Sequence, residues 1–202
     1  VDLDNIPFYG LAEVTVGGRS CVISQTGFSG ESGYEIYLRN ATLYADDMWD
    51  AVLEAGKKHN LMVIAPAHHR RIQAGILSWG QDLDHEHNPF QCNLGYQVSL
   101  SGKGEWAKKG DYIGKQALEK MKADLKDGHK PYKLQLVGFE IGGKPIDEYA
   151  PDFWLVSPGD GGDPCGFITS PWYHPEKGKN IAMGYIPVDG PLNPNGFPKW
   201  EL

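Results

Sequence analysis

The 202-residue sequence is poor in cysteine, in positive charge and in long apolar runs, and each shortage excludes a class of protein. Cys21, Cys92 and Cys165 are odd in number and far apart, which favours free thiols in a reducing compartment over disulfides or a zinc site. The net charge of −7 argues against nucleic acid or an anionic membrane as partner. No apolar run approaches the roughly 20 residues that a membrane-spanning helix needs. These properties predict a globular, cytoplasmic protein.

The most informative segment is the glycine-rich run at 25–36. Its three glycines, at a spacing of three, allow tight turns and close approach of a ligand to the backbone. Glu31 and Glu35 flank the ring of Tyr34, and the run closes into an apolar strand. A carboxylate at such a junction can accept paired hydrogen bonds from a flat, nitrogen-rich ring such as a pterin. The alternative is a glycine loop that carries solvated acidic side chains.

Hydrophobic periodicity and turn residues predict an α+β chain. Ala45, Met48, Trp49, Val52 and Leu53 are expected to face inward from the first helix, and Ile72, Ile76 and Trp79 from the second. Short strands in the last third favour a small antiparallel barrel or sandwich. The expected strands are 11–16, 19–25, 34–39, 132–141, 153–157, 166–169 and 181–186, and the expected helices are 42–59, 66–79 and 115–126.

Several segments, in order along the chain, match motifs of one known family. They are Q-T-G-F-S-G-E-S-G-Y-E-I at 25–36, R-I-Q-A-G at 71–75, W-G-Q-D-L-D at 79–84, G-D-Y-I-G-K-Q-A-L at 110–118, G-F-I-T-S at 166–170 and N-I-A-M-G-Y at 180–185. Together they resemble the glycine-cleavage T-protein (aminomethyltransferase) family, whose motifs include T-G-[YF]-[TS]-G-E-x-G-[YF]-E-I and [YW]-G-x-D-[ML]-D. The resemblance covers nearly the whole chain.

The resemblance implies ferredoxin-like, split α+β layers of the T-protein type, followed by a small antiparallel β-barrel domain. By this template residues 1–84 complete a first, folate-binding domain that is discontinuous in sequence. Residues 85–127 complete a second α+β domain, and 128–202 begin the barrel. The chain is therefore expected to be the middle and C-terminal part of a longer protein.

The same resemblance implies an enzyme of one-carbon metabolism that uses tetrahydrofolate. It would transfer an aminomethyl or methyl group from a small donor to N5 of folate. The implied partners are this small methylated or aminomethyl donor and a lipoyl carrier protein. The family's catalytic carboxylate belongs to a segment outside these residues. No catalytic residue is therefore assigned, and the segment alone is expected to be inactive.

Four residues are the candidate cofactor-binding residues. Glu35 matches the family glutamate that holds the pterin ring, and the alternative is an exposed strand glutamate. Tyr34 could instead belong to the loop architecture. Arg71 matches an arginine of the family, with structural pairing as the alternative role. Trp79 occupies an aromatic position of the family, where stacking on folate and a place in the core are both open.

Two departures from the family pattern bear on the substrate. Ala67 stands where the glycine-cleavage members have a folate-binding arginine, and Gln73 stands where they usually have glutamate. Arg70 lies three residues after Ala67 and could replace that arginine only through a local shift in register. A methyl group cannot replace a forked, charged donor. The pattern therefore leans toward relatives that demethylate small methylated compounds.

Two alternative functions and one alternative site follow from the same region. The first function is that of a non-catalytic folate-binding relative linked to iron–sulfur assembly. Such relatives usually carry a cysteine that directly follows Lys-Gly, whereas Cys92 of this chain does not follow Lys-Gly. The second is the tail of a fused oxidase or dehydrogenase of methylated glycines. The cluster of acidic and histidine residues at 82–87 could suggest a metal site, but histidines two apart in a turn-rich segment point in different directions, so no metal is expected.

Overall fold

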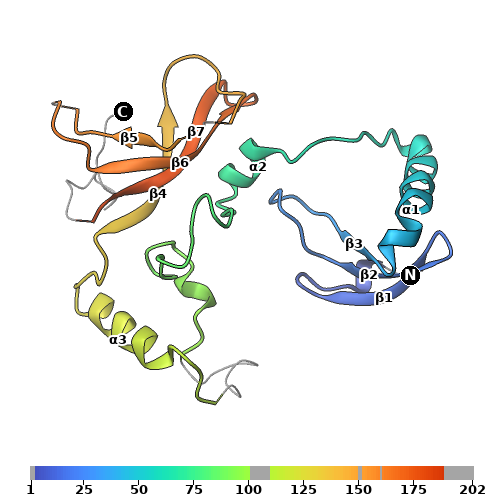
Figure 1. Cartoon of the computed structure of the whole chain (residues 1–202), viewed down its shortest axis with the longest axis horizontal. Helices are drawn as coiled ribbons and strands as arrows, with labels where there is room; N and C mark the ends of the chain where they lie inside the picture. Colours follow the sequence, from blue (N-terminus) through green and yellow to red (C-terminus); the bar gives the residue numbers. More distant parts are fainter. Residues whose placement is uncertain (1–2, 101–109, 150–151, 160, 189–202) are drawn as a thin grey trace. The chain divides into compact units, whose positions relative to one another are not determined.

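The computed structural model describes residues 3–100, 110–149, 152–159 and 161–188. The chain divides into two compact units, Val1–Ile76 and Leu77–Leu202, which are described separately below (Figure 1). The three-domain division at 84 and 127 stays a prediction. The first unit opens with the short 3-10 helix η1 (Leu3–Asn5).

A three-stranded antiparallel sheet forms the base of the first unit. It consists of β1 (Leu11–Val16), β2 (Arg19–Ser24) and β3 (Glu35–Leu38), in the order β1-β2-β3. Gly17 and Gly18 connect β1 to β2 with φ of 56° and 76°. A two-residue turn with both φ positive matches the right-handed twist of the strands that it joins. The predicted hairpin and third strand are confirmed.

Helix α1 (Ala41–Gly56), extended by the 3-10 helix η2 (Lys57–His59), lies against one face of this sheet (Figure 1). Met48 packs in the core with Val14 and Cys21. The predicted helix is confirmed, but the inward positions of Ala45 and Trp49 are wrong, because Ala45 is exposed and the side chain of Trp49 is 54% exposed. Trp49 lies about 100° around the helix from Met48, and the narrow sheet covers the side of the helix that carries Met48.

Helix α2 (His68–Gln73) is shorter than the predicted 66–79. Gly75 has φ of 71°, and the N–H of Ile76 donates to the carbonyl of Arg71 at 2.8 Å. A left-handed glycine with this backward hydrogen bond is a common helix ending. The prediction that Trp79 faces inward from this helix is wrong, because the helix has ended before it and its side chain is 62% exposed.

The second unit contains the second sheet. Its strands β4 (Leu134–Ile141), β5 (Trp154–Val156), β6 (Gly166–His174) and β7 (Lys179–Pro187) pair antiparallel in the order β4-β7-β6-β5. The four strands predicted here and the mixed α+β class are confirmed. In the described residues the sheet is open, so the barrel stays a prediction. Residues 189–202, at the end of the predicted third domain, lie outside the described residues.

Two short elements precede the second sheet in the chain. They are the 3-10 helix η3 (Gly95–Gln97) and helix α3 (Lys115–Lys126). The bounds of α3 agree with the predicted helix 115–126. The core of the sheet consists of Val156, Ile168, Ala182 and Ile186.

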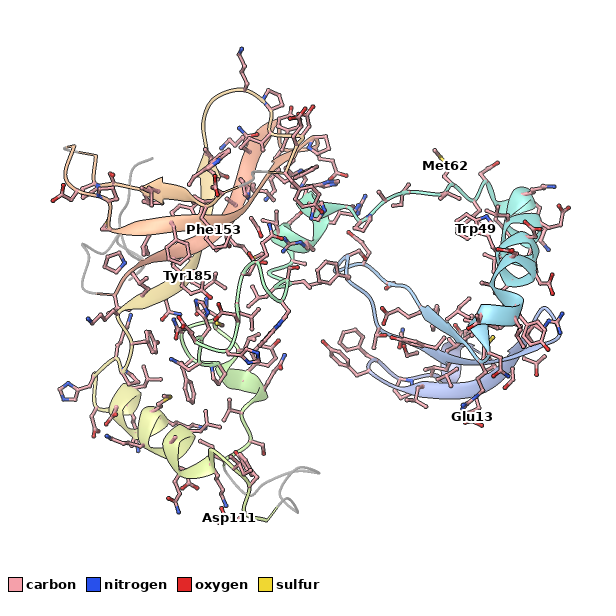
Figure 2. All side chains as sticks on the ribbon, in the orientation of Figure 1. Glu13, Trp49, Met62, Asp111, Phe153 and Tyr185 are labelled. Atoms are coloured by element: carbon pink, nitrogen blue, oxygen red, sulfur yellow. The ribbon has the colours of Figure 1, made fainter. Side chains whose placement is uncertain are left out.

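A buried carboxylate joins segments that are distant in sequence within the second unit. Asp82 Oδ1 accepts hydrogen bonds from the hydroxyls of Thr169 and Ser170, both at 2.5 Å, and its Oδ2 accepts one from the N–H of Ser78 at 2.8 Å. The hydroxyl of Tyr185, labelled in Figure 2, donates to the carbonyl of Asp82 at 2.7 Å. Three of the family-like motifs therefore meet in one network, which fixes the turn at 78–82 onto β6 and β7.

Candidate functional site

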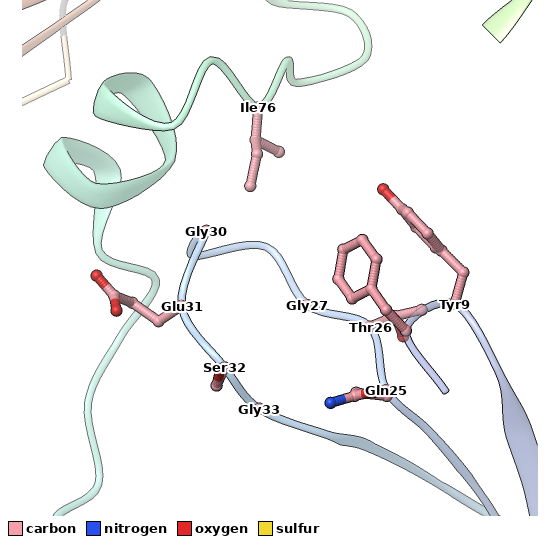
Figure 3. Close-up of a pocket in the computed structure, with 10 residues that line it drawn as sticks. Tyr9, Gln25, Thr26, Gly27, Gly30, Glu31, Ser32, Gly33 and Ile76 are labelled. Carbon is pink, nitrogen blue, oxygen red and sulfur yellow. The ribbon is translucent and has the colours of Figure 1, made fainter. Parts of the chain in front are cut away.

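The glycine loop forms a cavity of about 200 Å³ in the first unit (Figure 3). Its wall consists of residues of the loop 25–33 together with Phe8, Tyr9 and Ile76. The loop runs from the end of β2 toward the start of β3, so the sheet anchors both of its ends. The segment singled out from the sequence therefore surrounds a cavity.

Gly30 determines how closely the loop approaches the end of α2. It has φ of 77°, and a Cβ added there would lie 2.3 Å from the Cβ of Ala74. Only glycine combines this backbone conformation with this approach. Beside it, Glu31 pairs with Arg70 at 2.8 Å, and the side chains are 63% and 40% exposed, respectively. An exposed ion pair contributes at most about 1 kcal/mol, so Glu31 has an architectural contact of modest strength.

Two aromatic rings that the sequence analysis did not single out lie at the cavity. Phe8 and Tyr9 are 73% and 72% exposed, and their ring centroids are 4.3 Å apart. Tyr9 has φ of 62°, a costly conformation for a bulky residue. Its N–H donates to the carbonyl of Gln25 at 3.2 Å, which ties this turn to the loop. The only sequence signal was a pair of aromatic residues directly before a glycine and a strand.

Glu35 lies at the start of β3, half-buried and directly opposite Ser24. Its Oε2 accepts hydrogen bonds from the hydroxyl of Thr26 and from the hydroxyl of Tyr37, the latter at 3.0 Å. Glu35 is not part of the cavity wall, but Thr26 is. The carboxylate is therefore one hydrogen bond away from the wall. The sequence analysis did not single out Tyr37. Residues two apart on a strand share a face, so the position of Tyr37 relative to Glu35 could have indicated this contact.

Tyr34, unlike Glu35, makes its hydrogen bond to the segment before β1. Its hydroxyl donates to the carbonyl of Leu3 at 3.2 Å, and the residue does not contribute to the cavity wall. This bond ties the start of the chain to the loop, which agrees with the alternative of loop architecture. A role in cofactor binding stays a prediction.

Arg71 is buried, and its Nη1 donates to the carbonyl of Ile76 at 3.0 Å. Its guanidinium also lies 5.6 Å from the ring centroid of Phe28. Arg71 thus supports the backbone of a cavity residue, as structural pairing predicts, and its ligand contact stays a prediction. Ala67 lies at the N-terminus of α2 without a side-chain cap, and its methyl group offers no donor.

Trp79 belongs to the second unit, in the turn that Asp82 fixes. Its ring meets the ring of His85 edge-on, with centroids 5.0 Å apart and an interplanar angle of 77°. This exposed position does not agree with the core alternative, and stacking on folate stays a prediction.

The acidic and histidine cluster forms a local turn. Asp84 Oδ1 accepts a hydrogen bond from the N–H of Glu86 at 2.8 Å and lies 2.7 Å from Nδ1 of His87. The Glu86 N–H, and then His87, hold the pKa of Asp84 below its usual value. Among the described residues no group of three potential metal ligands is found. The described part of the chain also contains no helix that is long and apolar enough to cross a membrane.

Comparison with known families agrees with the motifs. The profile of the GCVT N-terminal domain matches residues 1–102 of the 202. The chain therefore belongs to this family, as the motif resemblance predicts.

Individual relatives extend the similarity to most of the chain. The aminomethyltransferase of Halothermothrix orenii is 31% identical over 191 residues, which cover 94% of this chain and 48% of the relative. That of Symbiobacterium thermophilum is 34% identical over 187 residues, which cover 90% of this chain and 44% of the relative. The chain thus spans about half the length of the curated relatives that it matches.

A solved structure supports the fold. The aminomethyltransferase T of the glycine cleavage system from Bartonella henselae matches with a TM-score of 0.69 over 93% of this chain and 46% of that protein. The sequence identity is 23%, so this match concerns the fold alone.

Proposed function

We propose that this chain binds tetrahydrofolate at the glycine loop, as part of a transferase that moves a one-carbon unit from a small donor to N5 of folate. One observation carries the proposal: an acidic side chain, Glu35, lies one hydrogen bond from the wall of a cavity with aromatic sides. The relatives named above, which are aminomethyltransferases, support it.

The residues present suit a pterin. A cavity of about 200 Å³ is smaller than the ~300 Å³ typical of sites for drug-sized ligands, so it would hold a bicyclic ring but not the whole cofactor. The exposed faces of Phe8 and Tyr9 offer surfaces against which a flat ring can stack. The carboxylate of Glu35 would accept hydrogen bonds from the N–H groups on the edge of the ring.

In the proposed reaction this chain positions the acceptor. Tetrahydrofolate supplies a secondary amine, N5, that accepts the one-carbon unit. By holding the ring, Glu35 and the aromatic side chains would align that amine with the bond that breaks in the donor, and alignment accounts for a large part of many rate enhancements. The proton acceptor of the reaction is not assigned to any residue of this chain.

The donor is the finer part of the proposal. An aminomethyl group on a lipoyl carrier protein and a methyl group on a small compound both fit a folate acceptor. Ala67 and Gln73, at positions where the glycine-cleavage members have arginine and glutamate, favour the methylated compound. A cytoplasmic location remains part of the proposal.

The two other functions considered from the sequence have less support. The relatives reported above are aminomethyltransferases, not iron–sulfur assembly proteins or oxidases. Cys92, on which the iron–sulfur alternative depends, is buried, and its sulfur lies 3.3 Å from the hydroxyl of Tyr185. Burial raises the pKa of this thiol, which opposes the thiolate form that binds metals.

Calorimetric titration of tetrahydrofolate into the full natural polypeptide tests the proposal. Glu35→Ala should weaken binding about 100-fold, because the charged acceptor for the N–H groups of the ring is lost. Glu13→Ala, which removes an exposed acidic side chain of β1 outside the cavity wall, is the matched control and should bind within about threefold of the parent. A folded parent that does not bind folate overturns the proposal, and a Glu35→Ala variant that binds like the parent removes Glu35 from the site.

A further inference from the structure

The two oxygens of the Glu35 carboxylate are in different situations. Oε2 accepts both hydroxyl hydrogen bonds, from Thr26 and from Tyr37. Oε1 accepts no hydrogen bond from the part of the chain that the structure describes. Oε2 is therefore engaged by the protein, and Oε1 keeps its capacity to accept a hydrogen bond from a ligand.

A buried hydroxyl stands behind Thr26. The Oγ of Ser24 lies 2.6 Å from the Oγ1 of Thr26, and Ser24 is a buried residue of β2. A hydroxyl has a single proton to donate. Because Thr26 donates its proton to Glu35, Ser24 must donate to Thr26. The hydrogen bonds therefore run in one direction, from Ser24 through Thr26 to Glu35.

This direction has a chemical consequence for the carboxylate. Glu35 receives hydroxyl protons and, when ionised, has none to donate. A ligand group that presents N–H to Oε1 is satisfied there, whereas a ring carbonyl or a ligand carboxylate would meet another acceptor. Because Thr26 belongs to the cavity wall and Glu35 does not, Thr26 connects the carboxylate to the cavity.

We propose that Thr26 is a positioning residue, which holds Glu35 so that Oε1 alone meets the donor edge of the bound ring. The site then selects heterocycles that carry an amino group or ring N–H at that edge. This inference rests on the proposed folate site. A glutamate has three side-chain torsions, and restricting them before binding reduces the entropy that the ligand must otherwise remove.

The affinities of matched variants for tetrahydrofolate, measured by calorimetry in the full natural polypeptide, test the positioning role. Thr26→Val keeps the shape of the side chain without its hydroxyl, and should weaken binding about tenfold. Thr26→Ser restores the hydroxyl, and should bind within about twofold of the parent. Ser24→Ala leaves Thr26 its proton, and should weaken binding by less than about threefold.

A ligand comparison tests the same inference without a mutation. A tetrahydrofolate analogue that lacks the amino group of the pyrimidine ring should bind the parent at least about tenfold more weakly, since Oε1 loses a donor. Thr26→Val should discriminate less between the two ligands than the parent does. This difference between ligands would not change if Thr26 only stabilised the fold.

The outcomes separate the inference from the proposed function. Weak binding by Glu35→Ala together with parental affinity in Thr26→Val overturns the positioning role and leaves the folate site in place. Failure of Thr26→Ser to restore affinity also overturns it, since the methyl group would then be the part that matters. Equal binding of the analogue and tetrahydrofolate by the parent overturns the selection for donors, even if Thr26→Val does not fold.

Discussion

Replacing Asp82 by alanine should strongly destabilise the second unit. The carboxylate is buried and accepts at least three hydrogen bonds, two of them from hydroxyls on β6. Removing a buried acceptor leaves its donors desolvated and without a hydrogen bond, which lowers the free energy of unfolding. The turn at 78–82 would also lose its fixed attachment to the sheet.

A minimum magnitude follows from these three donors. Thr169 has a second acceptor, the carbonyl of Met183 at 3.1 Å, which reduces its loss. The hydroxyl of Ser170 and the N–H of Ser78 each lose a carboxylate oxygen, at 2.5 and 2.8 Å. At about 1–3 kcal/mol for each buried donor, the expected loss in free energy of unfolding is about 3–5 kcal/mol. Asp82→Asn keeps one oxygen and should lose about half as much.

Urea denaturation followed by circular dichroism measures this loss. Asp111→Ala is the control, because Asp111 is exposed, and it should change the free energy of unfolding by less than about 0.5 kcal/mol (Figure 2). The slope of free energy against urea should remain unchanged, so that the midpoint alone reports stability. A loss below about 1 kcal/mol for Asp82→Ala would refute the reasoning, because the carboxylate would then not hold the network together.

Two further perturbations test the packing of each unit. Burial raises the pKa of Tyr185 and of Cys92, so the folded state favours their neutral forms, and stability should be fully present below the ordinary thiol pKa of about 8.5. Above that pH, the free energy of unfolding should fall by up to about 1.4 kcal/mol per pH unit for each group. Tyr185→Phe should flatten this decline above about pH 10. A urea midpoint that does not change with pH up to about 10.5 would contradict the prediction. Gly30→Ala should lower the thermal midpoint by several degrees, because its φ of 77° and the 2.3 Å approach to Ala74 leave no room for a methyl group. Gly33→Ala, where no atom lies within 4 Å of the added Cβ, should change the midpoint little, and equal effects of the two substitutions would disprove the role of Gly30.

Much of the secondary structure was predictable because its causes are local. The Gly17–Gly18 turn, the strands of both sheets and the bounds of α3 follow from alternation, helical periodicity and turn residues. The predicted length of α2 was too long, although Gly75 in the sequence could have indicated the end of the helix. An isolated glycine in a helical pattern is compatible with a helix that continues and with one that ends there. The positive φ of Gly75 ends the helix at this position.

The candidate site was predictable only in part. The glycine loop and Glu35 stand out in the sequence, whereas Phe8 and Tyr9 join the cavity wall from a turn that is tied to the loop by a backbone hydrogen bond. Trp49 illustrates the same limit for the core, because periodicity indicates an apolar stripe but not which edge of it a narrow sheet will cover.

The sequence by itself determined the family, the α+β class, the hairpin and the loop that surrounds the cavity, because these depend on motifs and on residues close together in the chain. Only the tertiary structure decided that Asp82 would accept hydrogen bonds from Thr169 and Ser170, nearly 90 positions further along. It also decided that Thr26 would connect Glu35 to the cavity wall. The physical reason is that a buried polar group must find a partner in space, and the identity of that partner depends on how the chain packs.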